Sequence, residues 1–132
     1  MMHFRVCRRC AATEPGRADE TFDCIDCSRA LCVDGHKARS RDERIIDDWL
    51  TANGILHERE PRLKGMHPDW RIGNVYVEYW GLAGQQGYEA RREEKLAIYK
   101  RRRLKLVELF PEDISSLEHK LGFLRGVKAF RF

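Results

Sequence analysis

The chain has 132 residues, 42% of them hydrophobic, which is enough for one compact domain with a small appendage and too few for two large domains. Its 25 Lys and Arg residues against 21 Asp and Glu give a net charge of +4, so any affinity for nucleic acid must come from local clustering. No stretch is apolar for long enough to form a secretory signal or a membrane span. We therefore expect a soluble, cytoplasmic protein without a membrane partner.

Two C-x-x-C pairs mark the N-terminal part of the chain. They consist of Cys7 and Cys10, then Cys24 and Cys27. In a reducing compartment this spacing is typical of zinc ligands, and four thiolates close a tetrahedron that leaves no position for a substrate. Residues 1–38 are therefore expected to form a zinc-ribbon-like segment with structural Zn²⁺. Cys32 or His36 could replace one of the four ligands, or Cys32 could be a small buried residue.

The next part of the chain, from residue 40, predicts a helix followed by a weak strand. Ser40 and Glu43 have the spacing of a capping box, and Asn53-Gly54 supplies a C-terminal stop. Apolar residues recur between them at helical spacing, at Ile45, Ile46, Trp49 and Leu50. Residues 55–63 are broadly extended, with Pro61 near their end, and predict a first strand.

A tight β-hairpin is predicted around the two-residue turn Gly73-Asn74. The turn fixes the register, pairing Ile72 with Val75, Arg71 with Tyr76, Trp70 with Val77, and Asp69 with Glu78. The two carboxylates of Asp69 and Glu78 are then expected on one face of the sheet, about 5 Å apart. Because like charges repel, such a pair is typical of a divalent cation site. The alternative is two solvated carboxylates at a sheet edge.

The remaining elements alternate between helix and strand. Residues 88–102 predict a helix with one face formed by Tyr88, Arg92, Lys95 and Tyr99. Residues 104–110 predict a strand, and Pro111 begins a terminal helix with a core-facing stripe of Ile114, Leu117, Leu121 and Leu124. The order α-β-β-β-α-β-α predicts an α/β sandwich with a mixed sheet and a right-handed crossover between its third and fourth strands.

Basic residues gather in and after the predicted helix at residues 88–102. The candidates for contact with nucleic acid are Arg91, Arg92, Arg101, Arg102 and Arg103. The alternative is the solvated face of an ordinary surface helix.

Residues 39–132 are expected to form one domain. Within it, roughly residues 40–125 resemble the PD-(D/E)xK nucleases, the superfamily of restriction endonucleases, very-short-patch repair nucleases and Holliday junction resolvases. Pro68-Asp69 matches the PD element, and Glu78-Tyr79-Trp80 matches the (D/E)xK element. The resemblance implies a restriction endonuclease-like α-β-β-β-α-β core with a mixed sheet. It also implies catalytic Mg²⁺ held by Asp69 and Glu78.

The chain departs from this family where Trp80 takes the place of the motif lysine. Some members of the superfamily carry the lysine on the following helix, and Lys95 is similar to that relocated residue, with Tyr99 completing a K-x-x-x-Y pattern. The alternative is a surface lysine in a basic run. The resemblance also implies Glu43 as a third Mg²⁺ ligand, against its alternative role in the helix cap. His67 precedes the motif and fits an ordinary loop histidine.

The function expected from these features is Mg²⁺-dependent cleavage of DNA, by nicking or structure-selective cutting, in repair, recombination or defence. Members of this fold often pair to cut both strands, which leaves a homodimer open. The alternative is a non-catalytic, zinc-containing adaptor that binds nucleic acid on a nuclease-like scaffold, which Trp80 favours. A third interpretation is a zinc-dependent module that docks to a larger protein machine.

Overall fold

The computed structural model describes residues 3–6, 13–17, 31–81 and 87–127. Its strands are β1 (Phe4–Val6), β2 (Thr13–Pro15), β3 (Glu58–Arg59), β4 (Trp70–Ile72), β5 (Val75–Tyr79) and β6 (Lys105–Leu109). Its helices are α2 (Arg41–Ala52), α3 (Tyr88–Arg101), the 3₁₀ helix η1 (Pro111–Ser116), α4 (Leu117–Leu121) and the 3₁₀ helix η2 (Gly122–Gly126). The four cysteines of the expected zinc segment, Cys7, Cys10, Cys24 and Cys27, lie outside the described residues. That segment, and the domain boundary after residue 38, stay predictions.

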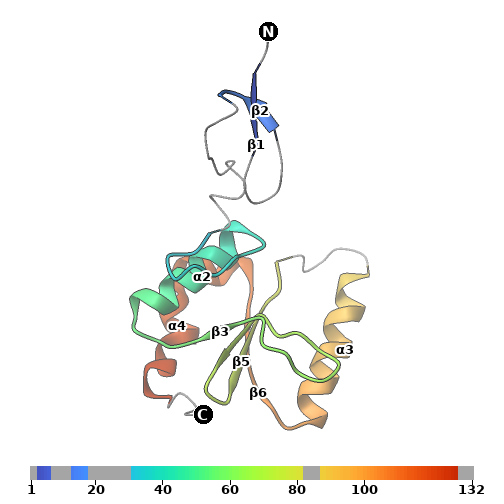
Figure 1. Ribbon diagram of the computed structural model, residues 1–132. Helices are drawn as coiled ribbons and strands as arrows, with labels where there is room; N and C mark the ends of the chain where they lie inside the picture. The colour runs from blue at the N-terminus through green and yellow to red at the C-terminus, as the bar shows by residue number, and fades with distance from the viewer. Residues whose placement is uncertain (1–2, 7–12, 18–30, 82–86, 128–132) are drawn as a thin grey trace.

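The centre of the fold is a four-stranded mixed sheet in the order β3-β4-β5-β6 (Figure 1). β3 pairs antiparallel with β4, and β4 pairs antiparallel with β5. β5 runs parallel to β6, and helix α3 connects the two strands. The predicted α/β class with a mixed sheet is therefore confirmed. A separate antiparallel pair, β1 and β2, forms a small hairpin near the N-terminus.

Helices cover both faces of this sheet, so the fold has three layers (Figure 1). One face packs against α2 and α4 in a core formed by Ile46, Leu50, Ile55, Trp70, Ile72, Val75, Val77, Leu109, Leu117, Leu121 and Leu124. The other face packs against α3 in a smaller cluster of Met66, Tyr76 and Tyr99. We call these the α2 face and the α3 face.

The hairpin register predicted from the Gly73-Asn74 turn is confirmed for the three residue pairs of β4 and β5, and the predicted pairing of Asp69 with Glu78 stays a prediction. Ile72 pairs with Val75, Arg71 with Tyr76, and Trp70 with Val77. Gly73 has φ of 56°, a left-handed conformation that glycine adopts without steric cost. Since side chains alternate along a strand, placing Trp70 and Val77 on the α2 face puts their neighbours Asp69 and Glu78 on the α3 face.

Helix α2 begins where the sequence predicts. The Ser40 hydroxyl accepts a hydrogen bond from the Glu43 amide at 3.2 Å. The helix ends at Ala52 with Asn53 as its C-cap, and Gly54 follows with φ of 68°.

Two predicted elements differ from the structure. The first strand shrinks from residues 55–63 to Glu58–Arg59, because only these residues pair with β4. The predicted terminal helix is a short α-helix between two 3₁₀ segments. Its apolar stripe is nevertheless placed as expected, since Leu117, Leu121 and Leu124 are buried and Ile114 packs beside them. Gly122 and Gly126 carry the low helix propensity that favours a break in a regular helix.

Truncating Leu121 in this core tests the packing of the C-terminal segment. Leu121 is fully buried, so we expect Leu121→Ala to lower the free energy of unfolding by about 2–5 kcal/mol. The same change at Leu56, which is 74% exposed, should alter it by less than about 0.5 kcal/mol. Urea denaturation of both variants measures the difference, and equal values would contradict the described packing.

Within the described residues, none of the helices has the length and apolar character needed to cross a membrane.

Candidate active site

Asp69 and Glu78 line one cavity on the α3 face, as the hairpin register predicted. Asp69 lies directly before β4, and Glu78 lies near the end of β5. The cavity has a volume of about 260 Å³ and is also lined by Tyr79, Trp80, Tyr88, Arg91, Arg92 and Lys95. Lys95 comes from α3, so the cavity brings together the two acids and the lysine of the sequence-based hypothesis.

Glu78 is held by two residues of α3 through a single carboxylate oxygen. Its Oε1 accepts a hydrogen bond from Lys95 Nζ at 2.8 Å and from the Tyr99 hydroxyl at 2.7 Å. The two donors lie one helical turn apart on α3, so both residues of the K-x-x-x-Y pattern bind the same oxygen of Glu78. Glu78 is only 1% exposed, and Tyr99 is buried beside it. Burial and the Glu78 charge raise the pKa of Tyr99, which keeps its hydroxyl protonated as a donor.

Lys95 also contacts the loop before the PD element. Its Nζ donates to the backbone carbonyl of His67 at 3.1 Å, while the His67 side chain is exposed. With its side chain 29% exposed and its amine in the cavity, Lys95 differs from an ordinary solvated lysine of a basic helix. It is directed toward the pair of acids.

The carboxyl group of Asp69 has a pKa above its ordinary value. Its Oδ2 accepts a hydrogen bond from the Tyr79 amide at 2.8 Å, which fixes the carboxylate beside the end of β5. Burial and the negative charge of Glu78 raise the pKa of Asp69 to about 7, although the Tyr79 amide and the charges of Arg59 and Lys95 act in the opposite direction. A buried carboxyl whose pKa is raised beside a second carboxylate is a candidate functional group, and a bound cation would stabilise its ionised form.

The donor set of this pair fits a hard divalent cation. Among the described residues, Asp69 accepts hydrogen bonds through Oδ2 and Glu78 through Oε1. One oxygen of each carboxylate, Oδ1 of Asp69 and Oε2 of Glu78, therefore keeps its lone pairs for another ligand. Two carboxylates in an open cavity, with room for water and for a phosphate oxygen, match the usual surroundings of Mg²⁺ in proteins.

Glu43 is placed differently from the sequence-based hypothesis. Its carboxylate binds Arg59 Nη2 and accepts a hydrogen bond of 3.3 Å from the Ser40 hydroxyl. The groups of three or more described residues with ligand atoms within 4.8 Å of one another do not include Glu43, Asp69 and Glu78. Burial raises the pKa of Glu43, and the Arg59 charge opposes this rise. Glu43 thus forms an ion pair beside the acid pair.

Arg59 is a site residue that the sequence analysis missed. Its Nη1 donates to the Asp69 carbonyl at 2.9 Å and lies 3.8 Å from Asp69 Oδ1, while Nη2 binds Glu43. Its guanidinium also stacks over the Trp70 ring, 4.5 Å from the centroid. The one sequence signal was a lone basic residue between Glu58 and Glu60 in the predicted first strand.

A second cavity extends the site along α2. It has a volume of about 430 Å³ and is lined by Arg39, Ser40, Asp42, Glu43, Asp69, Tyr79, Gly81 and Tyr88. Because Asp69, Tyr79 and Tyr88 line both cavities, the acid pair lies where the two meet. Each cavity is also lined by a cationic side chain, Arg91 of α3 in the first and Arg39, which precedes α2, in the second.

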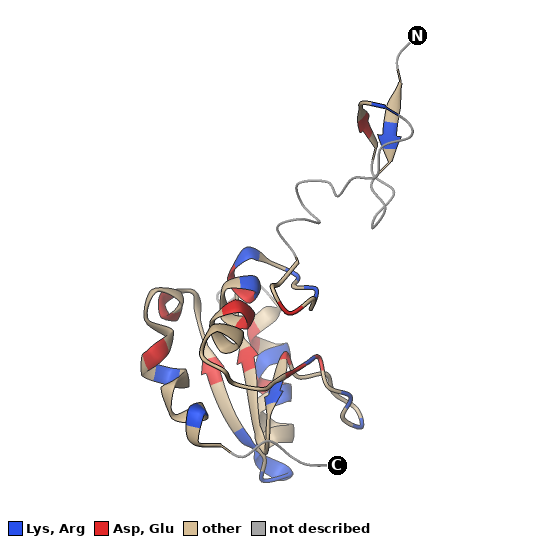
Figure 2. Cartoon of the chain, turned by 60° about the vertical axis from the view of Figure 1, so that its left-hand side comes forward, with Lys and Arg blue, Asp and Glu red and all other residues tan. Residues whose placement is uncertain are grey.

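The five arginines proposed to bind nucleic acid have different surroundings. Arg92 is paired with Glu108 of β6 at 2.6 Å, and Arg102 donates to the Lys64 carbonyl at 2.5 Å. Arg91, Arg101 and Arg103 are exposed. Figure 2 shows the basic residues at the turn between α3 and β6.

The residue in the place of the motif lysine is buried. Trp80 is 4% exposed and packs edge-on against Tyr88 at 6.2 Å between ring centroids. Lys95 Nζ lies 5.7 Å from the centre of its ring. Trp80 therefore forms a wall of the cavity, and the amine comes from α3.

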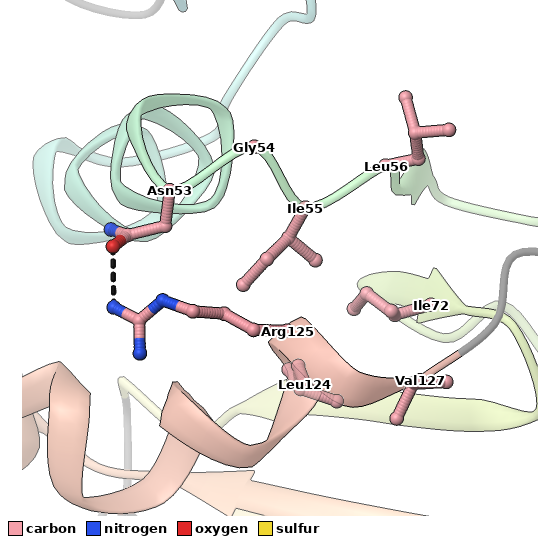
Figure 3. Close-up of a pocket in the computed structure, with 8 residues that line it drawn as sticks. All are labelled: Asn53, Gly54, Ile55, Leu56, Ile72, Leu124, Arg125 and Val127. Atoms are coloured by element: carbon pink, nitrogen blue, oxygen red, sulfur yellow. Dashed lines mark hydrogen bonds between the residues drawn. The ribbon is translucent and has the colours of Figure 1, made fainter.

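Another cavity, of about 250 Å³, lies on the α2 face away from these acids (Figure 3). It is lined by Asn53, Gly54, Ile55, Leu56, Ile72, Leu124, Arg125 and Val127. Arg125 reaches across it to the Asn53 side chain. Because no carboxylate or histidine lines it, this cavity is a poor candidate for metal chemistry.

The ionisation of Asp69 gives a test of the described geometry. In the protein without divalent cations, we expect the Asp69 carboxyl carbon to titrate near pH 7 in an NMR experiment. Because this pKa lies above the ordinary value of 3.8, ionisation of Asp69 opposes folding. The neutral form of Asp69 therefore adds to the free energy of unfolding. This contribution is complete at low pH and is lost as the pH rises through about 7. A midpoint near 4 would contradict the described burial of Asp69 beside Glu78.

Comparisons with known proteins gave no match to this chain among the family models, the curated proteins or the solved structures. The chain is a small α/β protein with a mixed four-stranded sheet.

Proposed function

We propose that this protein is a Mg²⁺-dependent DNA endonuclease related to the PD-(D/E)xK nucleases. The observation that carries the proposal is the cavity in which Asp69, Glu78 and Lys95 meet. Their arrangement also agrees with the order of elements, because one acid precedes β4 and the other lies near the end of β5, before the crossover helix. This is the order expected for a restriction endonuclease-like core.

Asp69 and Glu78 are the residues proposed to hold Mg²⁺, through the oxygens that their hydrogen bonds leave available. When bound, Mg²⁺ supplies a Lewis acid for the phosphate oxygens and lowers the pKa of a water that attacks phosphorus. Asp69 must be ionised for this role, so its raised pKa predicts weaker cation binding as the pH falls below about 7.

Lys95 is proposed as the cationic residue of the reaction. Its ammonium group has three hydrogen bonds to donate, and two go to Glu78 and the His67 carbonyl. The third is available for the attacking water or for a phosphate oxygen, where negative charge develops during cleavage. Tyr99 acts as a positioning residue, because its hydroxyl holds the same Glu78 oxygen.

Glu43 and Arg59 are proposed to support the site from the side of α2. Arg59 binds the Asp69 backbone and the Glu43 side chain, and so links α2 to the residue before β4. In this arrangement Glu43 orients Arg59. A role for Glu43 as a direct Mg²⁺ ligand is therefore less well supported than the roles of the two cavity acids.

DNA is the proposed substrate because cationic side chains border the cavity and continue beyond it. Arg91 lines the cavity, and Arg101 and Arg103 extend the exposed basic surface to the end of α3 and the turn that follows. Contacts of this kind with phosphates do not read sequence and weaken as salt rises. The N-terminal segment, stabilised by structural Zn²⁺, would add to this binding through the arginines of that segment.

A plasmid assay tests the proposal and separates it from the adaptor hypothesis, which the buried Trp80 favours. We expect the full-length protein to convert supercoiled plasmid into nicked or linear DNA with Mg²⁺ and not with EDTA. Nicked product indicates action as a monomer on one strand, whereas direct linearisation indicates a homodimer. Salt-sensitive binding of the plasmid without any cleavage would reject the enzyme and support the adaptor.

A further inference from the structure

Four metal-binding side chains converge on the α2 face, behind the proposed nuclease site. Asp34 and His36 come from the segment before α2, Asp47 comes from α2, and His57 precedes β3. The candidate ligand atoms all lie within 4.8 Å of one another. We call these four residues the Asp–His cluster. Neither the proposed cleavage reaction nor the expected four-cysteine site uses them.

Two buried polar atoms of this cluster have no hydrogen-bond partner among the described residues. They are Oδ1 of Asp47 and Nε2 of His57. Asp47 is fully buried, and the His57 side chain is 4% exposed. Nε2 of His57 lies 2.9 Å from Asp34 Oδ2 and 3.2 Å from Asp47 Oδ1, but not in the direction that a hydrogen bond requires. Leaving such atoms without a partner destabilises the folded protein, so they require an explanation.

Neighbouring groups orient the two atoms toward the centre of the cluster. His57 Nδ1 lies 2.8 Å from the Ile55 carbonyl. Because this carbonyl can only accept, Nδ1 carries the proton and, in the neutral ring, Nε2 carries the lone pair. The Trp70 indole donates to Asp47 Oδ2 at 2.9 Å, which leaves Asp47 Oδ1 for another ligand. Outer hydrogen bonds of this kind are typical of histidine and carboxylate metal ligands.

The spacing of the cluster fits tetrahedral coordination. His36 Nδ1 lies 2.7 Å from Asp34 Oδ2, and it also lies 3.2 Å from Asp47 Oδ2, the oxygen that Trp70 holds. Together with the two distances from His57 Nε2, the distance between His36 Nδ1 and Asp34 Oδ2 gives three pairs of proposed ligand atoms that lie 2.7–3.2 Å apart. This approaches the spacing of neighbouring ligand atoms in a tetrahedral Zn²⁺ site, about 3.3 Å for bonds of about 2.0 Å. A set of two imidazoles and two carboxylates also favours Zn²⁺ over Mg²⁺ or Ca²⁺, which prefer oxygen ligands.

We infer that Asp34, His36, Asp47 and His57 bind one Zn²⁺ ion in a closed, structural site. The ion joins the segment before α2 to the helix and to the chain that enters β3. The cysteine next to the site, Cys32, stays outside the ligand set, because its sulfur falls in a group with Asp47 and Asp48 and not in the group formed by these four residues. The inference does not depend on the proposed nuclease activity.

The site also lies directly behind the proposed nuclease residues. Trp70, which orients Asp47, is the neighbour of Asp69, and Arg59 follows His57 by two residues. The zinc ion therefore stabilises the ends of the segments that carry Arg59 and Asp69. We expect its removal to lower the melting temperature of the protein and to loosen these segments in hydrogen exchange.

The competing explanation is a buried ion network without metal. Burial lowers the pKa of His57, but the neighbouring Asp47 carboxylate, the Ile55 carbonyl and the Asp34 charge outweigh burial and raise it, so a proton on Nε2 competes with the ion. A protonated His57 between two aspartates would account for the same short distances. The two explanations differ in what Nε2 of His57 binds.

NMR of the ¹⁵N-labelled, full-length protein loaded with ¹¹³Cd²⁺ distinguishes them. Excess Mg²⁺ is included so that Cd²⁺ does not occupy the oxygen ligands of Asp69 and Glu78. We expect scalar coupling between ¹¹³Cd and Nε2 of His57, and a ¹¹³Cd resonance well upfield of any thiolate-bound signal. An uncoupled, protonated Nε2 in the loaded wild-type protein would overturn the inference.

Variants provide the second measurement. We expect His57→Gln to bind one zinc ion fewer per chain than the wild type, measured by metal analysis of the reconstituted proteins. The matched control is His119→Gln, because His119 is exposed on α4 and should leave the zinc content unchanged. Equal zinc content in both variants would contradict the site. If His57→Gln does not fold, the scalar coupling between ¹¹³Cd and Nε2 of His57 in the wild-type protein tests the site by itself, because that measurement requires no substitution.

Discussion

Asp69→Asn is expected to reduce Mg²⁺-dependent plasmid cleavage by about 1,000-fold or more. The substitution keeps the volume of the side chain and an oxygen that accepts from the Tyr79 amide, but it removes the charge proposed to hold the cation. Loss of a metal that stabilises charge in the transition state is worth several kcal/mol, and about 4 kcal/mol corresponds to a 1,000-fold loss of rate. Initial rates of nicking at saturating Mg²⁺ measure the effect.

The same variant should be at least as stable as the wild type. At pH 8 the ionised Asp69 is repelled by Glu78, as its raised pKa indicates, and a neutral asparagine removes this repulsion. We therefore expect an equal or higher melting temperature for Asp69→Asn without divalent cations. A loss of activity accompanied by unfolding would not support a role in metal binding.

Asp113→Asn is the matched control. Asp113 accepts hydrogen bonds of 2.8 Å from a backbone amide, that of Phe110, and from Lys120, so the substitution disturbs a similar set of contacts outside the cavity. Cleavage should persist in this variant. If both variants lose activity equally, the acid pair has no special part in the reaction.

Lys95→Met is expected to reduce the rate of cleavage by about 100-fold while leaving affinity for DNA almost unchanged. The variant keeps the length of the side chain and removes the ammonium that lies 2.8 Å from Glu78. The expected loss is typical of a positioned proton donor. Single-turnover cleavage and DNA binding in Ca²⁺ separate the two effects.

Lys100→Met on the same helix distinguishes a role in the reaction from a general effect of charge. Lys100 is exposed, so its loss removes the same charge outside the cavity. We expect this variant to cleave at nearly the wild-type rate and to bind DNA slightly less well. If the Lys95 and Lys100 variants behave alike, Lys95 belongs to the solvated basic face that the sequence offered as the alternative.

The acid pair could be predicted from the sequence because it depends on local rules. The two-residue turn at Gly73-Asn74 fixes the pairing of its neighbours, and alternation along the strands assigns faces. Lys95 followed from helical periodicity, since a residue one turn before Tyr99 shares its face. To place these three side chains, it is enough to predict the secondary structure and the strand register.

The interactions that the sequence did not reveal are contacts between segments far apart in the chain. Their geometry depends on how those segments pack against one another. Glu43 and Arg59 lie 16 residues apart, and their ion pair forms because α2 crosses beside β3. Asp47 was not predicted as a site residue either, although it lies beside Ile46 on the buried side of α2. Its partners His57 and Asp34 could not be identified, because extended or irregular segments give no periodicity to place them.

The C-terminal segment shows how an apolar pattern constrains packing more firmly than helix type. Leu117, Leu121 and Leu124 are buried as their spacing predicted, although the backbone alternates between 3₁₀ and α geometry. Burial depends on which side chains face the sheet, and both helix types place these leucines on the same side.

The central claim, that Asp69 and Glu78 together hold a divalent cation, is tested most directly by anomalous diffraction from crystals grown with Mn²⁺. The account predicts an anomalous peak in the cavity between the two carboxylates, within coordination distance of both. A well-ordered cavity with both side chains resolved and no such peak at saturating Mn²⁺, or a peak that one acid alone contacts, would contradict it.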